Sequence, residues 1–327
     1  MTTLVTRSGN LFRIHCTRSV FARRRARAGL AAALLALALG ATLPATGQWD
    51  DFSSGNDSGW THYDPLGALF GPMTTFEVTN QAYRIQTSIP PVPDAGPGRG
   101  GSLRMDKTYS DFYVCVDLIA WDDTVRQVFG VAARLGTVGF GTTRGYLFSY
   151  DRSAGATAGD FDLSRLTGEQ AAQIETGPSG LHLVAGQSYR LVFVGKGPYL
   201  DAYVYGLPNT NTALLHLTGM DATYTSGVCG LIVADNPDDA VMAQGDATFD
   251  NYLATEREPL MLAVAREPDS TLVTVTWPAS YPEYTLESSP SLGVGAIWTP
   301  ESAFSDGRIF VHYADSSTGV KFFRLKK

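Results

Sequence analysis

Aspartates are the side chains in this chain with the plainest capacity for chemistry. Asp160 and Asp162 stand two residues apart in "DFDLSRL", and in a strand such a pair shares one face. Two carboxylates ~7 Å apart suit the general acid and base of an inverting glycosidase. A solvated strand face is the other interpretation, because charged side chains mostly stay exposed. Glycosidases of the glucanase type place a clustered carboxylate motif, E-x-D-x-x-E, on one strand so that its side chains flank the glycosidic bond. Residues 78–168 contain no glutamate, so that motif is absent from this part of the sequence.

A second set of aspartates could hold a metal ion. Asp51 follows the start of "QWDDF", and Asp246 and Asp250 lie in "GDATFDNY". If these two stretches form paired strands, the three carboxylates offer the oxygen ligands that Ca²⁺ takes. No D-x-D-x-D-G loop supports this, and the stretches could simply close a sheet, with Asp51, Asp250 and Asn251 capping strand ends. A structural calcium ion is therefore one of two open interpretations.

Aromatic side chains alternate along two expected strands. In "PYLDAYVYG" one face carries Tyr199, Asp201, Tyr203 and Tyr205, and in "GYLFSY" one face carries Tyr146, Phe148 and Tyr150. An exposed face of this kind is a platform on which carbohydrate rings stack, with polar groups beside them. If the face points into the protein, the same rings are core, which is the default for amphipathic strands.

Trp121 is a further candidate for stacking on a sugar ring. It precedes Asp122 and Asp123 in "WDD", so that an indole and two carboxylates stand together. A buried tryptophan at a strand-end turn is the alternative. We therefore count Trp121 with Tyr199, Asp201, Tyr203 and Tyr205 as the glycan-binding candidates.

Several catalytic classes find no support. The sequence contains no G-x-S-x-G, no G-x-x-x-x-G-K-[ST] and no H-E-x-x-H. The histidines are scattered and show no H-x₃-H spacing. Two cysteines beyond residue 47 are too few for a four-ligand zinc site. We identify no catalytic residue, and an enzyme is the less favoured interpretation.

The N-terminus has the pattern of a secretory signal peptide. Arginines at positions 23, 24, 25 and 27 precede an apolar stretch from Gly29 to Leu43, and Ala45 and Gly47 provide small residues for cleavage. A membrane anchor would need ~20 apolar residues, more than this stretch has. Residues 1–47 are thus predicted to be removed on export, leaving a periplasmic, extracellular or cell-surface protein with no membrane span.

Charge restricts the partners. Residues 1–47 hold seven arginines and no acidic residue, so 18 of the 25 basic and all 32 acidic side chains remain beyond them, a formal net charge of −14. Such a surface repels phosphate backbones and anionic lipid. Nucleic acid is therefore not expected as a partner, whereas neutral polysaccharides, basic partners and divalent cations remain.

Cys115 and Cys229 are the two cysteines of this remaining part. In an oxidising compartment they could form a disulfide, which would close a loop of ~100 residues and stabilise by ~4 to 5 kcal/mol in the chain-entropy model. Two buried free thiols are the equal alternative, since cysteine packs as a small hydrophobe.

Short alternating runs separated by glycine and proline dominate the chain after Gln48. They include "DFYVCVDLIAW", "QVFGVAARL", "QSYRLVFVG" and "SGVCGLIVAD". Strands of this length and spacing predict an all-β fold, an antiparallel β-sandwich over residues 48–255. The charged stretch "ATEREPLML" marks a boundary, and residues 256–327 form a small C-terminal β module in this interpretation.

The first part resembles the concanavalin A-like lectin/glucanase jelly-roll sandwich, in its laminin-G-like and 3-keto-disaccharide-hydrolase-like branch of secreted bacterial proteins. The residues that carry the likeness are "QWDDFSSGNDSGWTHYDP", "TTFEVTNQAYRIQTS", "GYLFSYDR", "VAGQSYRLVFVGKGPYLDAYVYG" and "GDATFDNYLA". The likeness implies that the first and last strands are neighbours, with Phe52, Phe249 and Tyr252 facing the core.

The C-terminal part resembles a short module at the end of many secreted bacterial multi-domain proteins, by "VTWPAS", "YTLESSPSL", Trp298 and "FFRLKK". Attachment, spacing and sorting are all open as its role. For the whole chain the leading hypothesis is a non-catalytic, lectin-like carbohydrate-binding protein. The alternatives are a glycan-cleaving hydrolase that uses aspartates or a metal, and a structural or adhesive surface module without a glycan site.

Overall fold

The computed structural model describes residues 47–151, 159–177, 181–210, 212–235, 244–266, 271–306, 309–315, 317 and 321–327. The predicted signal peptide, except for Gly47, lies outside them. The chain divides into two compact units between Glu256 and Arg257, next to the boundary predicted from composition. In the part of the chain that the structure describes, no helix is long and apolar enough to cross a membrane.

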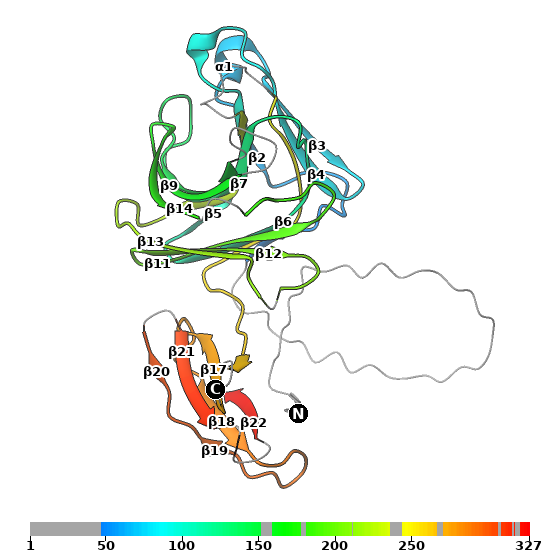
Figure 1. Cartoon of the computed structure of the whole chain (residues 1–327). Helices are drawn as coiled ribbons and strands as arrows, with labels where there is room; N and C mark the ends of the chain where they lie inside the picture. The colour runs from blue at the N-terminus through cyan, green and yellow to red at the C-terminus, as the bar shows by residue number, and fades with distance from the viewer. Residues whose placement is uncertain are drawn as a thin grey trace, which may run out of the picture. The chain divides into compact units, whose positions relative to one another are not determined.

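Two antiparallel sheets make up the first unit. Sheet A has the order β13-β12-β11-β6-β15-β4-β3, with β1 also paired to β15, and sheet B has the order β10-β9-β8-β7-β14-β5-β2. Figure 1 shows the two sheets as stacked layers, and sheet B curves with its hollow side away from sheet A. The predicted all-β antiparallel sandwich is confirmed by this strand pairing.

The strands of sheet A are β1 (Gln48–Asp50), β3 (Thr74–Thr79), β4 (Ala82–Thr87), β6 (Phe112–Trp121), β11 (Tyr189–Lys196), β12 (Tyr199–Gly206), β13 (Leu215–Met220) and β15 (Asp246–Thr255). Those of sheet B are β2 (Thr61–Tyr63), β5 (Arg99–Tyr109), β7 (Gln127–Leu135), β8 (Gly145–Asp151), β9 (Asp160–Thr167), β10 (Gln170–Thr176) and β14 (Gly227–Asp235). A short helix α1 (Gly67–Phe70) and a 3₁₀ turn (Pro93–Ala95) lie between strands.

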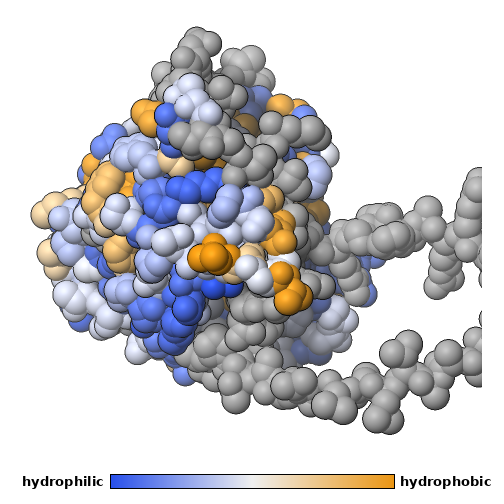
Figure 2. Space-filling view, turned by 90° about the horizontal axis from the view of Figure 1, so that it is seen from below, coloured by the Kyte–Doolittle hydropathy of each residue, from blue (hydrophilic) through white to orange (hydrophobic). Residues whose placement is uncertain are grey.

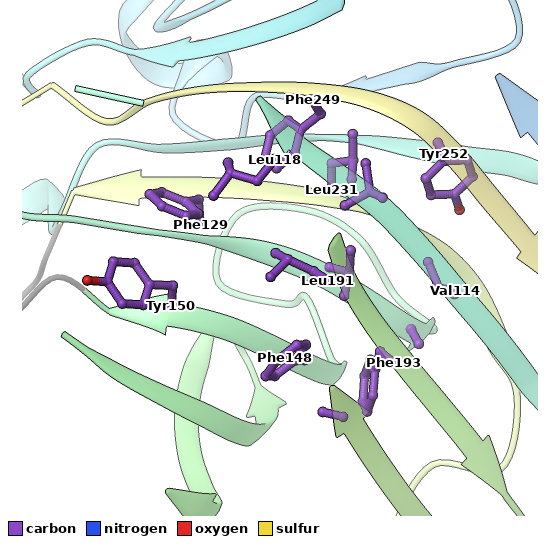
Figure 3. Close-up of a cluster of buried hydrophobic side chains, with 14 of the residues drawn as sticks. Val114, Leu118, Phe129, Phe148, Tyr150, Leu191, Phe193, Leu231, Phe249 and Tyr252 are labelled. Atoms are coloured by element: carbon purple, nitrogen blue, oxygen red, sulfur yellow. The ribbon is translucent and has the colours of Figure 1, made fainter. Parts of the chain in front are cut away.

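The core fills the space between the two sheets. Alternate residues of each strand point into it, as the period of two in a strand requires. Figure 3 shows these side chains from both layers: Val114, Leu118, Leu191, Phe193, Phe249 and Tyr252 of sheet A, and Phe129, Phe148, Tyr150 and Leu231 of sheet B. Strand β8 thus contributes Phe148 and Tyr150, together with Tyr146, to the core, which is the second of the two predicted fates of that face.

The first and last strands of the sandwich are neighbours, as the resemblance implied. Asp50 of β1 is paired with Tyr252 of β15. Phe52, Phe249 and Tyr252 are fully buried. The predicted role of Asp250 and Asn251 was wrong, because they lie inside β15 at an irregularity of the ladder, where Asn251 has φ +52°. Such a bulge re-aims side chains in the middle of a strand.

Cys115 and Cys229 are both buried, and neither is part of a disulfide. Cys115 packs with Val192 and Leu253 on the outer side of sheet A, whereas Cys229 belongs to the core between the sheets. Because the backbone of sheet A separates the two positions, the disulfide is not formed. The structure therefore has the alternative of two packed thiols.

The second unit consists of two small sheets. Sheet C has the order β16-β17-β21-β20, and sheet D the order β19-β18-β22. Their strands are β16 (Ala263–Arg266), β17 (Leu272–Pro278), β18 (Thr285–Ser289), β19 (Thr299–Pro300), β20 (Phe304–Ser305), β21 (Ile309–Asp315) and β22 (Phe322–Lys326). Val273, Val275, Trp277, Leu286, Ala314 and Phe323 form their common core.

Hydrophobic residues also occur on the surface. In Figure 2 they form separate spots between hydrophilic residues on the face that the view presents. Single exposed apolar side chains are normal in folded proteins. Surface hydropathy therefore does not single out a site here, and the geometry of particular side chains must do so.

Candidate functional site

Strand β12 places the predicted tyrosines on the surface of the sandwich. Leu200, Ala202 and Val204 are fully buried and point into the core. The intervening residues therefore point out of sheet A. We call the outward side chains of β12 and their neighbour on β13 the tyrosine face: Tyr199, Asp201, Tyr203, Tyr205 and His216.

The rings of the tyrosine face are ordered by contact with one another. Tyr203 lies directly opposite His216 on β13, and their ring centroids are 4.2 Å apart with an interplanar angle of 11°. Tyr205 is nearly parallel to Tyr203, at 6.2 Å and 20°. Tyr199 is 44% exposed, as is the side chain of His216. Tyr203 therefore sits inside a row of rings whose members reach solvent.

Asp201 sets a carboxylate among these rings. Its Oδ1 lies 3.1 Å from Nε2 of His216. The aspartate is largely buried, while the histidine is not. This contact orients the imidazole against Tyr203 and places hydrogen-bonding groups beside aromatic carbon. Sequence analysis did not find His216, because only the register of β12 with β13 brings it opposite Tyr203.

A buried ion pair supports the tyrosine face from the neighbouring strands. Arg190 of β11, which is paired with Tyr205 in the sheet, donates to both carboxylate oxygens of Asp117 at 2.7 and 2.9 Å. Asn251 donates to the same carboxylate at 3.0 Å. Burial raises the pKa of Asp117, against the opposing effect of Arg190 and Asn251. The bulge in β15 thus completes a fixed polar cluster beside the rings.

Trp121 does not belong to this face, and its predicted role in sugar stacking is wrong. Its side chain is 8% exposed and packs in the core near Phe129 and Tyr189, with ring centroids 5.9 and 6.0 Å away. Asp122 accepts hydrogen bonds from the backbone and hydroxyl of Thr124 at 2.9 and 2.6 Å. This is the strand-end turn with a buried tryptophan that the sequence offered as the alternative.

The three calcium candidates have other contacts. Asp246 accepts from Nε of Arg84 at 2.8 Å and from Gln86 at 3.2 Å. Asp51 accepts from the backbone of Ser53, and Asp250 from that of Asn251. Among the described residues, no group of three or more histidine, cysteine, aspartate or glutamate side chains is arranged to hold a metal ion. The first and last strands do pair, but they do not assemble these carboxylates into a ligand set.

Asp160 and Asp162 lie on the hollow side of sheet B, away from sheet A, because Phe161 between them points into the core. Asp162 accepts from Gln173 and Thr176 at 2.6 and 2.8 Å. Asp160 lies directly opposite Asp151 in the ladder, and its buried Oδ1 has no hydrogen-bond partner among the described residues. The shared face predicted from the spacing is therefore present.

Glu169 forms a network on sheet B that sequence analysis missed. It accepts from Nη2 of Arg99 at 2.9 Å, from the hydroxyl of Tyr63 and from the backbone of Gly141 at 2.6 Å. Burial acts to raise the pKa of its carboxyl, but these hydrogen bonds outweigh burial and lower it. Phe140 covers the guanidinium of Arg99 at 5.5 Å. Nη1 of Arg99 also donates to the backbone oxygens of Ala95 and Pro97, at 3.2 and 2.9 Å, so the cluster holds loops together.

Comparisons with known proteins give likenesses of structure only. No protein-family model and no curated protein matches the sequence. The carbohydrate-binding module CBM66 from Bacillus subtilis is 17% identical, with 60% of this chain and 95% of the module covered and a TM-score of 0.42. Basic winged bean lectin with Tn-antigen is 10% identical, with 64% and 98% covered and a TM-score of 0.44. The CBM2 module of the evolved Dit of Lactobacillus casei BL23 phage J-1 is 12% identical, with 63% and 93% covered and a TM-score of 0.38. These proteins are lectins and carbohydrate-binding modules, but at such TM-scores we draw no function from them.

Proposed function

We propose that this protein binds carbohydrate at the tyrosine face without cleaving it. The observation that carries the proposal is the row of Tyr205, Tyr203 and His216 on the outside of sheet A, with Asp201 bonded into it. The opposite face of β12 serves the main core between the sheets, whereas Tyr203 and Tyr205 pack against the small cluster of Cys115, Val192 and Leu253 on the outer side of sheet A and stay partly exposed.

The chemistry of the face suits a sugar. A pyranose or furanose ring has apolar C–H faces and a rim of hydroxyl groups. Aromatic rings contact the first, and carboxylate, imidazole and phenol groups hydrogen-bond to the second. Each such contact contributes on the order of 1 kcal/mol net. A face of this size therefore predicts weak binding to a single sugar and stronger retention on a polymer.

The setting that fits this role is outside the cytoplasm. The basic and apolar N-terminal segment supports export, and the acidic remainder supports a neutral rather than an anionic ligand. We therefore propose an exported protein that acts in the periplasm, outside the cell or on its surface. A polysaccharide or cell-surface glycan is the proposed partner.

The test is retention of the chain from Gln48 to Lys327 on immobilised and soluble glycans, with and without chelator. We expect Tyr199→Ala with His216→Ala to lower affinity at least tenfold and to leave folding intact. Leu69→Ala, an exposed apolar residue of α1, is the matched control and should bind as the parent does. Equal binding by parent and double variant would contradict the assignment of the binding site to the tyrosine face. No retention of the parent on any glycan would contradict the proposed function itself.

A hydrolase remains a second candidate because of one observation on the hollow side of sheet B: Asp160 lies opposite Asp151, and its buried Oδ1 has no hydrogen-bond partner in the part of the chain that the structure describes. Two carboxylates on neighbouring strands can act as acid and base or as acid and nucleophile. Release of reducing sugar from a retained glycan would favour this candidate. Asp160→Asn and, separately, Asp162→Asn should then show which carboxylate is needed.

A further inference from the structure

In the second unit, the side of sheet C that points away from the core carries few charged residues. In sheet C, Val273, Val275 and Trp277 of β17 belong to the core, so the alternate residues Thr274 and Thr276 face outward. Their partners across the ladder are Tyr313 and Val311 of β21, and Val311 is in turn paired with Phe304 of β20. Residues directly opposite in a ladder share a face. We call Thr274, Thr276, Phe304, Val311 and Tyr313 the sheet C face.

Charge is distributed unequally between the two sheets of this unit. On sheet D, Glu287 accepts two hydrogen bonds from Arg324, at 2.8 and 2.6 Å, and Lys326 lies 3.2 Å away. Arg324 also covers the ring of Trp298 at 4.2 Å. On sheet C, the outward positions of the described strands carry one charged residue, Asp315 at the end of β21.

An exposed aromatic pair stands on this nearly uncharged surface. Phe304 is 53% and Tyr313 54% exposed, and their ring centroids are 5.8 Å apart at an interplanar angle of 30°. Thr274 and Thr276 flank them with partly exposed hydroxyl groups. A surface with rings and hydroxyls but almost no charge loses little when it gives up water to a neutral, flat partner.

Charge argues for a neutral polymer over the other occupants. The acidic charge of the chain lies almost wholly in the first unit, since residues 257–327 hold seven basic and eight acidic side chains. An anionic lipid surface would need basic side chains, and the described outward positions of sheet C provide none. A basic protein would need carboxylates that this face does not provide. The faces of sugar rings in a neutral polysaccharide can contact Phe304 and Tyr313, and their hydroxyls can hydrogen-bond to the threonines.

We propose that the sheet C face is a second binding surface, for the flat side of a neutral, insoluble polysaccharide. The choice of ligand class rests on the proposed function of the first unit. Two surfaces on one chain raise retention on a polymer through effective concentration, by ~10²-fold or more where both can engage at once. On a short soluble oligosaccharide the second surface adds nothing, because one ligand does not reach both.

The experiment compares depletion of four proteins from solution by microcrystalline cellulose, chitin and insoluble β-1,3-glucan. They are the chain from Gln48 to Lys327, its Phe304→Ser with Tyr313→Ser variant, its Tyr199→Ala with His216→Ala variant, and the combination of all four substitutions. Ile297→Ser, at another exposed apolar residue of the second unit, is the matched control. Near-ultraviolet circular dichroism and thermal melting establish that each variant is folded.

We expect the sheet C variant to need at least tenfold more polymer for equal depletion, with unchanged binding of soluble oligosaccharide. The control should behave as the parent. Equal depletion by parent and sheet C variant overturns this proposal. The proposed function of the tyrosine face is then tested separately, by the binding of the Tyr199→Ala with His216→Ala variant. A parent that self-associates through Phe304 and Tyr313 in sedimentation velocity also overturns it, since the occupant would be a second copy. If the double variant does not fold, the single substitutions Phe304→Leu and Tyr313→Leu each remove one ring, keep an apolar side chain, and are tested in the same way.

Discussion

Strands β8 and β12 have the same sequence pattern and opposite outcomes. Each alternates aromatic residues with others, yet Tyr146, Phe148 and Tyr150 of β8 are fully buried between the sheets. Tyr199, Tyr203 and Tyr205 of β12 lie on the outer side of sheet A instead. Aromatic alternation therefore shows that a strand has two different faces, but not which face is the core.

The residues between the aromatic ones explain the difference. In β12 they are Leu200, Ala202 and Val204, a wholly apolar set that gains most by leaving water. In β8 they are Leu147, Ser149 and Asp151, a more polar set, and Leu147 and Ser149 are buried on the other side of sheet B, away from the core between the sheets. In each strand, the less polar of its two faces points into the core between the sheets. In β12 that face is the aliphatic one, because tyrosine carries a hydroxyl group.

The largest loss in the free energy of unfolding should come from a substitution on the buried face of β8. Phe148→Ala removes a fully buried ring from the centre of the core, which typically costs about 3 to 5 kcal/mol. Urea unfolding of the chain from Gln48 provides the free energy. A loss below 1 kcal/mol would mean that the two strands do not differ as described.

Breaking the Arg190–Asp117 ion pair beside the tyrosine face should lower the free energy of unfolding by nearly as much. Arg190→Ala leaves the buried carboxylate of Asp117 without its cation, at about 3 kcal/mol. Because the pKa of Asp117 is raised in the fold and rises further without Arg190, the deficit should shrink as the pH falls and the carboxyl takes up a proton. A double-mutant cycle with Asp117→Asn measures the coupling, and a deficit that does not change with pH would contradict this account.

Replacing Glu169, whose pKa is shifted in the direction opposite to that of Asp117, should have an intermediate effect on the free energy of unfolding. Its pKa is lowered in the fold, so it adds stability at pH values above its unfolded pKa near 4.5, and this is lost as the pH falls through the folded value. Glu169→Gln should cost about 1 to 3 kcal/mol at pH 7. Chemical unfolding at pH 7 and at pH 3.5 should show the difference between parent and variant shrinking, whereas a constant difference would point to packing alone.

The smallest effect on stability should come from the exposed face. Tyr199→Ala is expected to change the free energy of unfolding by at most about 0.5 kcal/mol, because the residue is 44% exposed in the fold and lies outside the core. Thermal melting beside Phe148→Ala makes the contrast direct. A loss of 2 kcal/mol would place Tyr199 in a packed region and weaken the case for a binding surface.

Part of the site was predictable from the strands alone. The period of two placed Tyr199, Asp201, Tyr203 and Tyr205 on one face, and the same reasoning placed Asp160 and Asp162 together. Trp121 was misassigned because the indole beside two aspartates looked exposed, whereas it closes the core at the end of β6. The ion pair of Arg99 with Glu169 has no local signal, since 70 residues separate its members.

The sequence by itself determined the all-β class and the approximate strands, because alternation, turn residues and β-branched runs are local properties, whereas the pairing of the first and last segments was implied by the family resemblance. Tertiary structure alone decided which face of β12 meets water, that Cys115 and Cys229 stay apart, and that His216 joins Asp201 and the tyrosines. The physical reason is that register and layer order bring distant residues together, and local periodicity contains neither.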